Sequence, residues 1–188
     1  MEILHKTRLS IVPVILSFLF LAVPSPALSG HAQHPVPIDA VTCQTDVRYS
    51  PHGGAAAVVI STLDRAEQTV HVAIYGLTHS GIVDALIAAQ GRGVEIVVKT
   101  DRLQSAGQAQ SAAIARLEEA GVTVEVSNQS RQLHDKFAVI DGRWVVTGSF
   151  NWTTNAENRN RENLVILDCP DLAQNFEAEW ELIRPDAP

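Results

Sequence analysis

Apolar and polar positions change their spacing several times along the chain, and from Val47 onward the changes follow a regular order. Stretches with helical spacing of apolar residues alternate with short runs rich in Val and Ile. The predicted helices are 53–68, 80–90 and 105–119, and the predicted strands are 69–75, 94–99 and 122–126. Because helices and strands alternate over short Gly-containing links, the pattern predicts an α/β domain whose first half is largely parallel.

The second half of the chain is dominated by β-rich runs. Its predicted elements are the strands 133–140, 143–147 and 163–168 and an amphipathic helix at 171–183. The first two strands flank Asp141-Gly142, a dipeptide that favours a two-residue β-hairpin. The pattern therefore predicts one mixed β-sheet with helices on both faces.

The start of the chain has the pattern of an export signal. Lys6 and Arg8 precede an apolar run at 11–23, and small residues and prolines follow up to residue 30. The run is too short for a good membrane span, which needs ~20 apolar residues. We expect cleavage after Ser29, with Ala27 as the competing site and an uncleaved membrane anchor as the alternative.

These features divide the chain into three parts. The prediction is a signal peptide at 1–29, a polar and Pro-rich linker at 30–44, and one folded domain at 45–188. The protein is expected to be exported, either periplasmic or secreted, with no stable membrane span after cleavage.

Charge adds a mild constraint on function. The formal net charge is −7 at pH 7, which argues against a tight binder of polyanions because phosphate affinity rests on Lys and Arg. The charge is uneven, however, and a local basic excess lies between residues 131 and 161. Its arginines are Arg131, Arg143, Arg159 and Arg161.

The chain has two cysteines, Cys43 and Cys169. In an exported protein an even pair favours one disulfide, which would close a long loop and stabilise the fold by ~4–5 kcal/mol. Two buried thiols are the alternative. Two cysteines are too few for a structural zinc site, which usually has four Cys or His ligands.

Residue types that can carry chemistry gather around the predicted hairpin. His134 and Lys136 are two positions apart on one predicted strand, so both side chains point to the same face. Ser149 and Asn151 follow directly after the next strand, and strand ends in α/β sheets are where ligands usually bind. Together these groups suit an anionic phosphorus centre. Lys136 and Asn151 would hold the non-bridging oxygens, and His134 would attack or transfer a proton.

The spacing of these residues resembles a known motif. The chain reads His134-x-Lys136-x4-Asp141-x6-Gly148-Ser149-x-Asn151. This pattern resembles the HKD motif of the phospholipase D superfamily. The resemblance covers the chain from about residue 45 to residue 184. Within the superfamily, the chain resembles the short bacterial endonucleases that carry a single motif. It implies that 45–188 is a phospholipase D-like catalytic domain with one HKD motif per chain.

Not every motif residue is expected to act on the substrate. Asp141 is explained by turn geometry alone, so we expect a structural role for it. Gly148 is expected to permit a backbone conformation, and Ser149 to donate a hydrogen bond. Glu162 could be an exposed charge at a strand edge, whereas the resemblance implies a hydrogen bond to the catalytic histidine. His71, alone on a strand, is expected to be a core or surface histidine.

The resemblance also implies a mechanism and a partner. His134 would form a phosphohistidine, a second histidine would protonate the leaving oxygen, and water would then release the product. Lys136 would supply the fixed positive charge, so no metal or other cofactor is expected. Superfamily members with one chain and one site carry two motifs, but this chain carries one. We therefore predict a homodimer with one composite site on its two-fold axis.

Three functions fit these residues. The leading hypothesis is a metal-independent endonuclease that cleaves DNA or RNA without sequence preference, supported by the local arginines. The first alternative is a phospholipase that cleaves phosphatidyl head groups. It would need apolar surface near the site, for which Phe150 and Trp152 are the local candidates. The second alternative is a non-catalytic module that binds nucleic acid or the cell envelope. Loss of a motif residue would indicate such a module, and no motif residue is missing.

Overall fold

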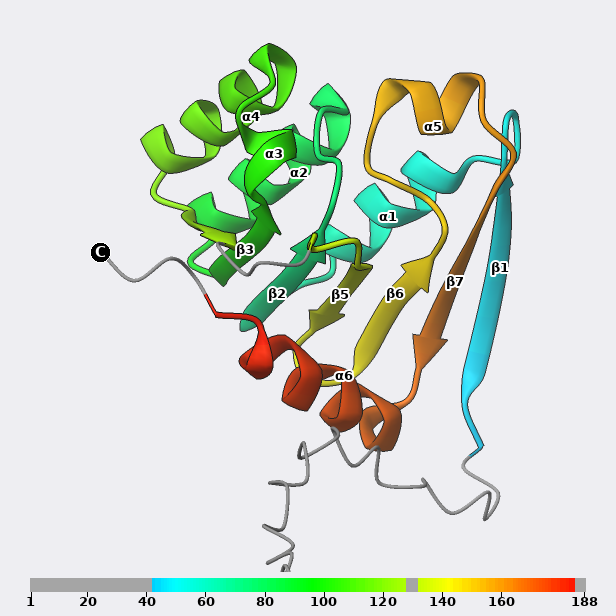
Figure 1. Cartoon of the computed structure of the whole chain (residues 1–188). Helices are drawn as coiled ribbons and strands as arrows, with labels where there is room; N and C mark the ends of the chain where they lie inside the picture. Colours follow the sequence, from blue (N-terminus) through cyan, green and yellow to red (C-terminus); the bar gives the residue numbers. More distant parts are fainter. Residues whose placement is uncertain (1–41, 128–131, 185–188) are drawn as a thin grey trace, which may run out of the picture. The chain divides into compact units, whose positions relative to one another are not determined.

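One seven-stranded sheet organises the structure, with strand order β1-β7-β6-β5-β2-β3-β4 (Figure 1). The computed structural model describes residues 42–127 and 132–184. The strands are β1 (Gln44–Ser50), β2 (Thr69–Ile74), β3 (Glu95–Asp101), β4 (Thr123–Ser127), β5 (Lys136–Ile140), β6 (Trp144–Gly148) and β7 (Glu162–Asp168). The helices are α1 (Ala55–Leu63), α2 (Ser80–Gly91), α3 (Arg102–Ser105), α4 (Gln108–Glu119), α5 (Thr154–Asn158) and α6 (Pro170–Leu182).

The sheet is mixed, as predicted. Strands β2, β3 and β4 pair in parallel, and helices α2 and α4 lie between them in the chain. Strands β5, β6, β7 and β1 are antiparallel to their neighbours. The two halves meet where β2 pairs with β5, so residues 69–74 and 136–140 lie side by side in the middle of the sheet.

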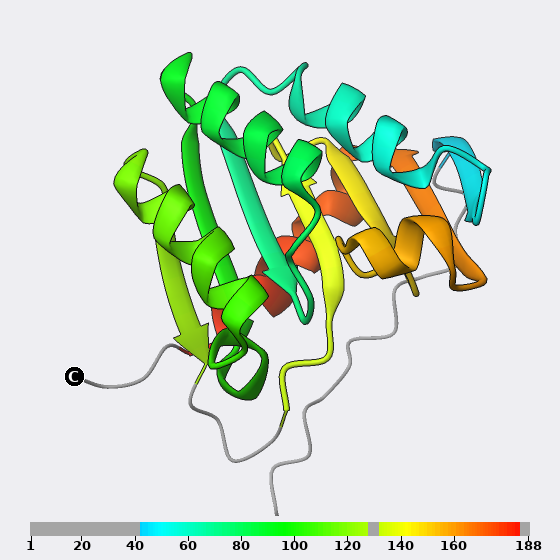
Figure 2. The same cartoon turned by 90° about the horizontal axis from the view of Figure 1, so that it is seen from above.

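Helices cover both faces of the sheet, which confirms the predicted architecture. Figure 2 shows α6 behind the sheet and α1, α2, α4 and α5 in front of it. Strand β5 contributes side chains to the hydrophobic core on each face of the sheet, because its side chains alternate between the two faces. Ala138 and Ile140 belong to the larger core, whereas Phe137 and Val139 belong to the smaller core under α6.

A buried lysine fixes the C-terminal end of α6. Lys99 is 6% exposed, and its Nζ atom donates to the carbonyl oxygens of Trp180 and Ile183 at 3.0 and 2.9 Å. Lys99 thus binds two carbonyls at the helix end, of which the Trp180 carbonyl also accepts from the Ile183 N–H. His71 stacks on the Trp180 ring with centroids 4.1 Å apart and contacts the Glu177 carboxylate. This histidine therefore packs against α6.

Several boundaries differ from the predictions. The predicted helix 53–68 ends at Leu63, and Arg92 donates to the carbonyl oxygens of Leu63 and Ala66 that the end exposes. The predicted helix 105–119 corresponds to α4, which begins later, at Gln108, and a separate short helix, α3, ends at Ser105. Strand β1 and helix α5 were not predicted. β1 is an edge strand with exposed side chains and α5 is short, so neither has a strong apolar period.

The loop of the predicted hairpin is one residue longer than the two residues expected. The last paired residues are Ile140 and Trp144, so three residues link β5 to β6. Asp141 and Gly142 have φ values of 52° and 59°, and the Arg143 N–H donates to the Ile140 carbonyl at 3.0 Å. The turn therefore has the positive φ angles of a type I′ turn, which Asp-Gly favours.

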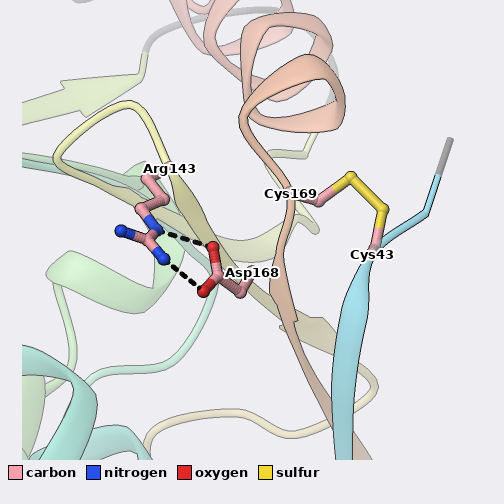
Figure 3. Close-up of a disulfide and its surroundings, with 4 residues drawn as sticks. All are labelled: Cys43, Arg143, Asp168 and Cys169. Carbon is pink, nitrogen blue, oxygen red and sulfur yellow. Dashed lines mark hydrogen bonds and ion pairs between the residues drawn. A yellow bond between two sulfur atoms is a disulfide. The ribbon is translucent and has the colours of Figure 1, made fainter.

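The predicted disulfide between Cys43 and Cys169 is present, with Cα atoms 4.9 Å apart (Figure 3). It joins the start of β1 to the residue that precedes α6. Nearby, the Arg143 guanidinium binds the Asp168 carboxylate through two hydrogen bonds of 2.6 and 2.7 Å. The bridge thus ties the edge strand to the helix on the sheet.

The signal peptide predicted at 1–29 and the linker up to residue 41 lie outside the described residues. Between residues 42 and 184, gap aside, the structure contains no helix with the length and apolar character needed to cross a membrane.

Candidate active site

His134 and Lys136 converge, although not as two residues of one strand. Strand β5 begins at Lys136, so His134 lies in the irregular segment before it. The Lys136 Nζ atom lies 3.2 Å from the His134 Nδ1 atom and donates to the His134 carbonyl oxygen at 2.6 Å. An imidazole and an ammonium therefore stand together at the end of a central strand, although the predicted strand was too long.

Tyr75 forms a wall beside this pair. It follows β2, which is paired with β5, and its ring centroid lies 4.6 Å from that of His134. The Lys136 Nζ atom is 5.2 Å from the same ring. The Tyr75 hydroxyl accepts hydrogen bonds from the side-chain amides of Gln104 and Gln132 at 2.7 and 2.9 Å. The Tyr75 side chain is therefore contacted by His134 and Lys136 at its ring and by two glutamines at its hydroxyl.

Ser149 and Glu162 form the other side of the site. The Ser149 hydroxyl donates to a Glu162 carboxylate oxygen at 2.6 Å and accepts from the Asn163 N–H at 3.1 Å. Asn160 donates to the second Glu162 oxygen at 2.9 Å. The resemblance implied a hydrogen bond from Glu162 to His134. Within the described chain, Glu162 instead binds Ser149 and Asn160.

Backbone contacts fix the two remaining motif residues on this side. Gly148 has a φ of 140°, and a Cβ atom there would lie 2.3 Å from the Asn163 carbonyl oxygen. Only glycine fits this close approach of β6 to β7. The Asn151 Oδ1 atom accepts from the Gly76 N–H at 3.2 Å, which orients the amide.

One pocket of about 400 Å³ brings these residues together. It is lined by His134, Lys136, Gly148, Ser149, Asn151 and Glu162. All the side chains in this list are polar, and they come from three neighbouring strands and the segments that flank them. The sequence grouped these residues by spacing, but it did not reveal Tyr75, Asn160 or Asn163 as their supports.

Asp141 lies at the opposite end of β5 from His134. Its carboxylate accepts hydrogen bonds from the N–H groups of Glu67, Gln68 and Thr69 at 3.0, 2.8 and 2.9 Å. The side chain thereby joins the hairpin to the link between α1 and β2. These contacts account for an aspartate at this position without any contact with substrate.

Burial lowers the pKa of the Lys136 ammonium, and the negative charges of Asp135 and Glu162 partly oppose this effect. A cation that is partly removed from water interacts more strongly with an anion than an exposed cation does. The site therefore contains a fixed positive charge suited to a phosphate oxygen.

The arginines that suggested an anionic substrate occupy different places. Arg143 lies at the far end of β6 and is paired with Asp168, so it is not available to the site. Arg159 and Arg161 are exposed just before Glu162, and Arg131 lies outside the described residues. Across 42–127 and 132–184, no group of three or more His, Cys, Asp or Glu side chains could hold a metal ion.

Residues 59–183 match the family model described as "Cardiolipin synthase, PLD-like domain". The chain belongs to the phospholipase D superfamily. A structure of the same superfamily, Nuc from Salmonella typhimurium, has a TM-score of 0.74 and 32% identity, and the match covers 78% of this chain and 100% of Nuc. NucT from Helicobacter pylori has the same fold, with a TM-score of 0.68 and 24% identity over 76% of this chain and 96% of NucT.

Curated relatives of this superfamily member carry lipid-related names. "Phospholipase D" of Rickettsia conorii is 32% identical over 132 residues, which are 70% of this chain and 65% of the relative. "Mitochondrial cardiolipin hydrolase" of Xenopus tropicalis is 33% identical over 150 residues, with 75% of this chain and 70% of the relative covered. The chain thus spans just under two thirds of the length of the rickettsial relative.

Proposed function

We propose that this chain is an exported, metal-independent phosphodiesterase that cleaves DNA or RNA without strong sequence preference. The observation that carries the proposal is the contact between the Lys136 Nζ and His134 Nδ1 atoms at 3.2 Å, beside a pocket lined by Ser149, Asn151 and Glu162. This set offers a nucleophile, a fixed cation and hydrogen-bonding groups around one phosphorus atom.

The reaction has two displacements at phosphorus. A ring nitrogen of His134 attacks the phosphorus atom, the ester P–O bond breaks, and an imidazolium protonates the leaving oxygen. Water then attacks the phosphohistidine, the P–N bond breaks, and the water proton returns to the imidazole that acted as the acid. Lys136 and Asn151 hold the non-bridging oxygens in both steps.

Substrate binding would also change the partners of His134. The Lys136 ammonium donates to the His134 carbonyl oxygen and faces Nδ1. An incoming phosphate oxygen competes for this ammonium because a charge-assisted hydrogen bond to an anion is the stronger one. The imidazole is then released to attack.

The acid in this scheme would be the partner's His134. The chain carries one motif, and in the described structure His134 and Ser149 are exposed side chains. A two-fold dimer sets the same surface patch of each subunit against the other. In such a dimer one imidazole acts as the nucleophile, and the partner's imidazolium donates the proton to the leaving oxygen.

Two observations favour nucleic acid over lipid as the substrate. Phe150 and Trp152, the two residues expected to offer apolar surface to a lipid, are each 1% exposed. Arg159 and Arg161 are exposed beside Glu162, where they can bind a phosphate backbone. The names of the rickettsial and frog relatives support phospholipid hydrolysis as the second candidate function.

Parallel assays of the mature protein in excess EDTA test this proposal. The substrates are plasmid DNA, single-stranded RNA and phosphatidylcholine vesicles, and the control is the His134→Asn variant. Cleavage of either nucleic acid by the wild type alone is the expected result. Hydrolysis of phosphatidylcholine without cleavage of nucleic acid would assign the second function, and loss of all activity in EDTA would contradict the metal-independent mechanism.

A further inference from the structure

A second pocket adjoins the site on the side of α6. It has a volume of about 420 Å³, a size typical of ligand sites. We call it the α6 pocket, and its lining includes Asp135, Lys136, Phe137, Asn175, Phe176 and Glu179. His134, Lys136 and Gly148 line both pockets. A group bound in the α6 pocket would therefore lie next to a phosphate bound at His134.

Helix α6 supplies the distinctive side chains of this pocket. Asn175 and Glu179 are four residues apart, so they project from the same face of the helix, and both are exposed. Phe176 is half-buried and packs edge to face on Phe137, with ring centroids 5.2 Å apart. Phe137 is 4% exposed, so Phe176 is the ring that a ligand can reach.

The charges of the α6 pocket differ from those of the phosphate pocket. Asp135 and Glu179 are carboxylates, and Lys136 is the one cation that lines it, at the junction with the phosphate pocket. Within residues 42–127 and 132–184, Glu179 takes part in no ion pair. A second phosphate would be repelled here, whereas a group with N–H donors would be attracted.

We propose that the α6 pocket is a nucleobase subsite, which stacks one base of the substrate on Phe176 and binds its amino group through Glu179. This inference rests on the proposed nuclease function. A nucleobase combines a flat π-face for Phe176 with an edge that the Asn175 amide and the Glu179 carboxylate can bind. Cytosine presents an amino group to such a carboxylate, and thymine does not.

The same pocket is poorly suited to a choline head group. A quaternary ammonium is held by several aromatic faces arranged as a cage. Among the lining residues, one phenyl ring is accessible, that of Phe176, and the other α6 side chains that line the pocket are a carboxamide and a carboxylate. A planar group with hydrogen-bond donors satisfies these groups better than a methylated cation does.

Three single-stranded substrates test the subsite: oligo-dC, oligo-dT, and a strand of abasic nucleotides that has the same backbone without bases. The variants are Phe176→Leu and Glu179→Gln, and the control is Glu119→Gln, the same change on the exposed end of α4. The measured quantity is kcat/KM for each substrate. Because the abasic strand does not use the subsite, its cleavage reports an intact catalytic centre in each preparation.

We expect Phe176→Leu to lower kcat/KM about 5- to 100-fold on oligo-dC and oligo-dT, and to leave the abasic strand unchanged. Glu179→Gln should lower kcat/KM on oligo-dC about fivefold or more relative to oligo-dT, and Glu119→Gln should change nothing. Wild-type rates for both α6 variants, or equal losses on all three substrates, would overturn the proposed subsite. The proposed nuclease function would be unaffected by either result. A wild-type protein that cleaves phosphatidylcholine and no oligonucleotide would overturn the proposed function as well.

Discussion

The Lys136 Nζ atom lies 3.2 Å from the His134 Nδ1 atom, and burial lowers the pKa of this ammonium despite two nearby carboxylates. Folding therefore disfavours the charge of Lys136, although the proposed chemistry requires it. A perturbed pKa in a pocket is typical of residues that serve a ligand rather than the fold. Stability and activity are expected to oppose one another at this position.

Lys136→Met should stabilise the protein and remove its activity. Methionine has a similar length and no charge, so it avoids the burial penalty but cannot hold a phosphate oxygen. We expect a higher thermal midpoint than wild type at neutral pH, and cleavage slower by about 10²–10³-fold.

The pH dependence of this difference in stability has a definite sign. Because the pKa of Lys136 is lower in the folded chain than in the unfolded chain, the penalty is fully present at neutral pH. The penalty decreases as the pH rises through the lowered pKa of Lys136 in the native state, because the side chain then loses its charge. The thermal midpoints of wild type and Lys136→Met should therefore approach one another from neutral to alkaline pH. A variant less stable than wild type at neutral pH would contradict this account.

Asp141→Ala should reduce stability and leave the chemistry intact. The change removes the acceptor for three backbone N–H groups and leaves a residue with a positive φ that alanine disfavours. We expect a loss of about 2–3 kcal/mol in urea unfolding, and a kcat within about twofold of wild type in the folded protein. Asp141→Asn, which keeps one acceptor and tolerates this φ, should lose less. A large loss of kcat in a fully folded Asp141→Ala protein would assign Asp141 to catalysis.

Removal of the disulfide should affect stability more than activity. Cys43 and Cys169 lie at the ends of β1 and β7 that are remote from Ser50 and Glu162. The double Ser variant is expected to lose about 2–5 kcal/mol of unfolding free energy and to keep its cleavage rate below its unfolding transition. A folded double variant without activity would show that the bridge positions the site.

The elements that could be predicted from the sequence are those with a regular buried period. Helix α2 and strand β3 are recognisable because their core side chains repeat at fixed spacing. Strand β1 was missed because edge pairing with β7 needs few buried residues, and Val47 and Tyr49 remain 42% and 62% exposed. Local spacing carries no signal for such pairing.

The same distinction applies to the candidate site. His134 and Lys136 were recognisable because the motif places them close together in sequence. Tyr75 reaches them only because β2 lies beside β5, and Asn163 reaches Ser149 only because β7 lies beside β6. Phe176 and Glu179 line the α6 pocket because α6 packs on the sheet. These tertiary contacts could not be derived from residue spacing.

Subunit mixing tests the composite site. If each site needs both histidines, a dimer of one wild-type and one His134→Asn chain is inactive. Mixing equal amounts of the two proteins and allowing exchange should lower the activity of the wild-type chains to about half, since random pairing leaves half of them in active dimers. An unchanged activity after verified exchange, or full activity of a monomer in sedimentation, would rule out the shared site.

The proposed mechanism depends above all on a covalent bond between His134 and phosphorus. The direct measurement is rapid-quench trapping of an oligonucleotide labelled on the phosphate side of the cleaved bond, followed by separation under alkaline denaturing conditions. We predict label on the wild-type protein that is stable to base, is released by acid, and is absent from His134→Asn. Label on the His134→Asn protein, or rapid turnover by wild type with no labelled protein at any time, would contradict the account.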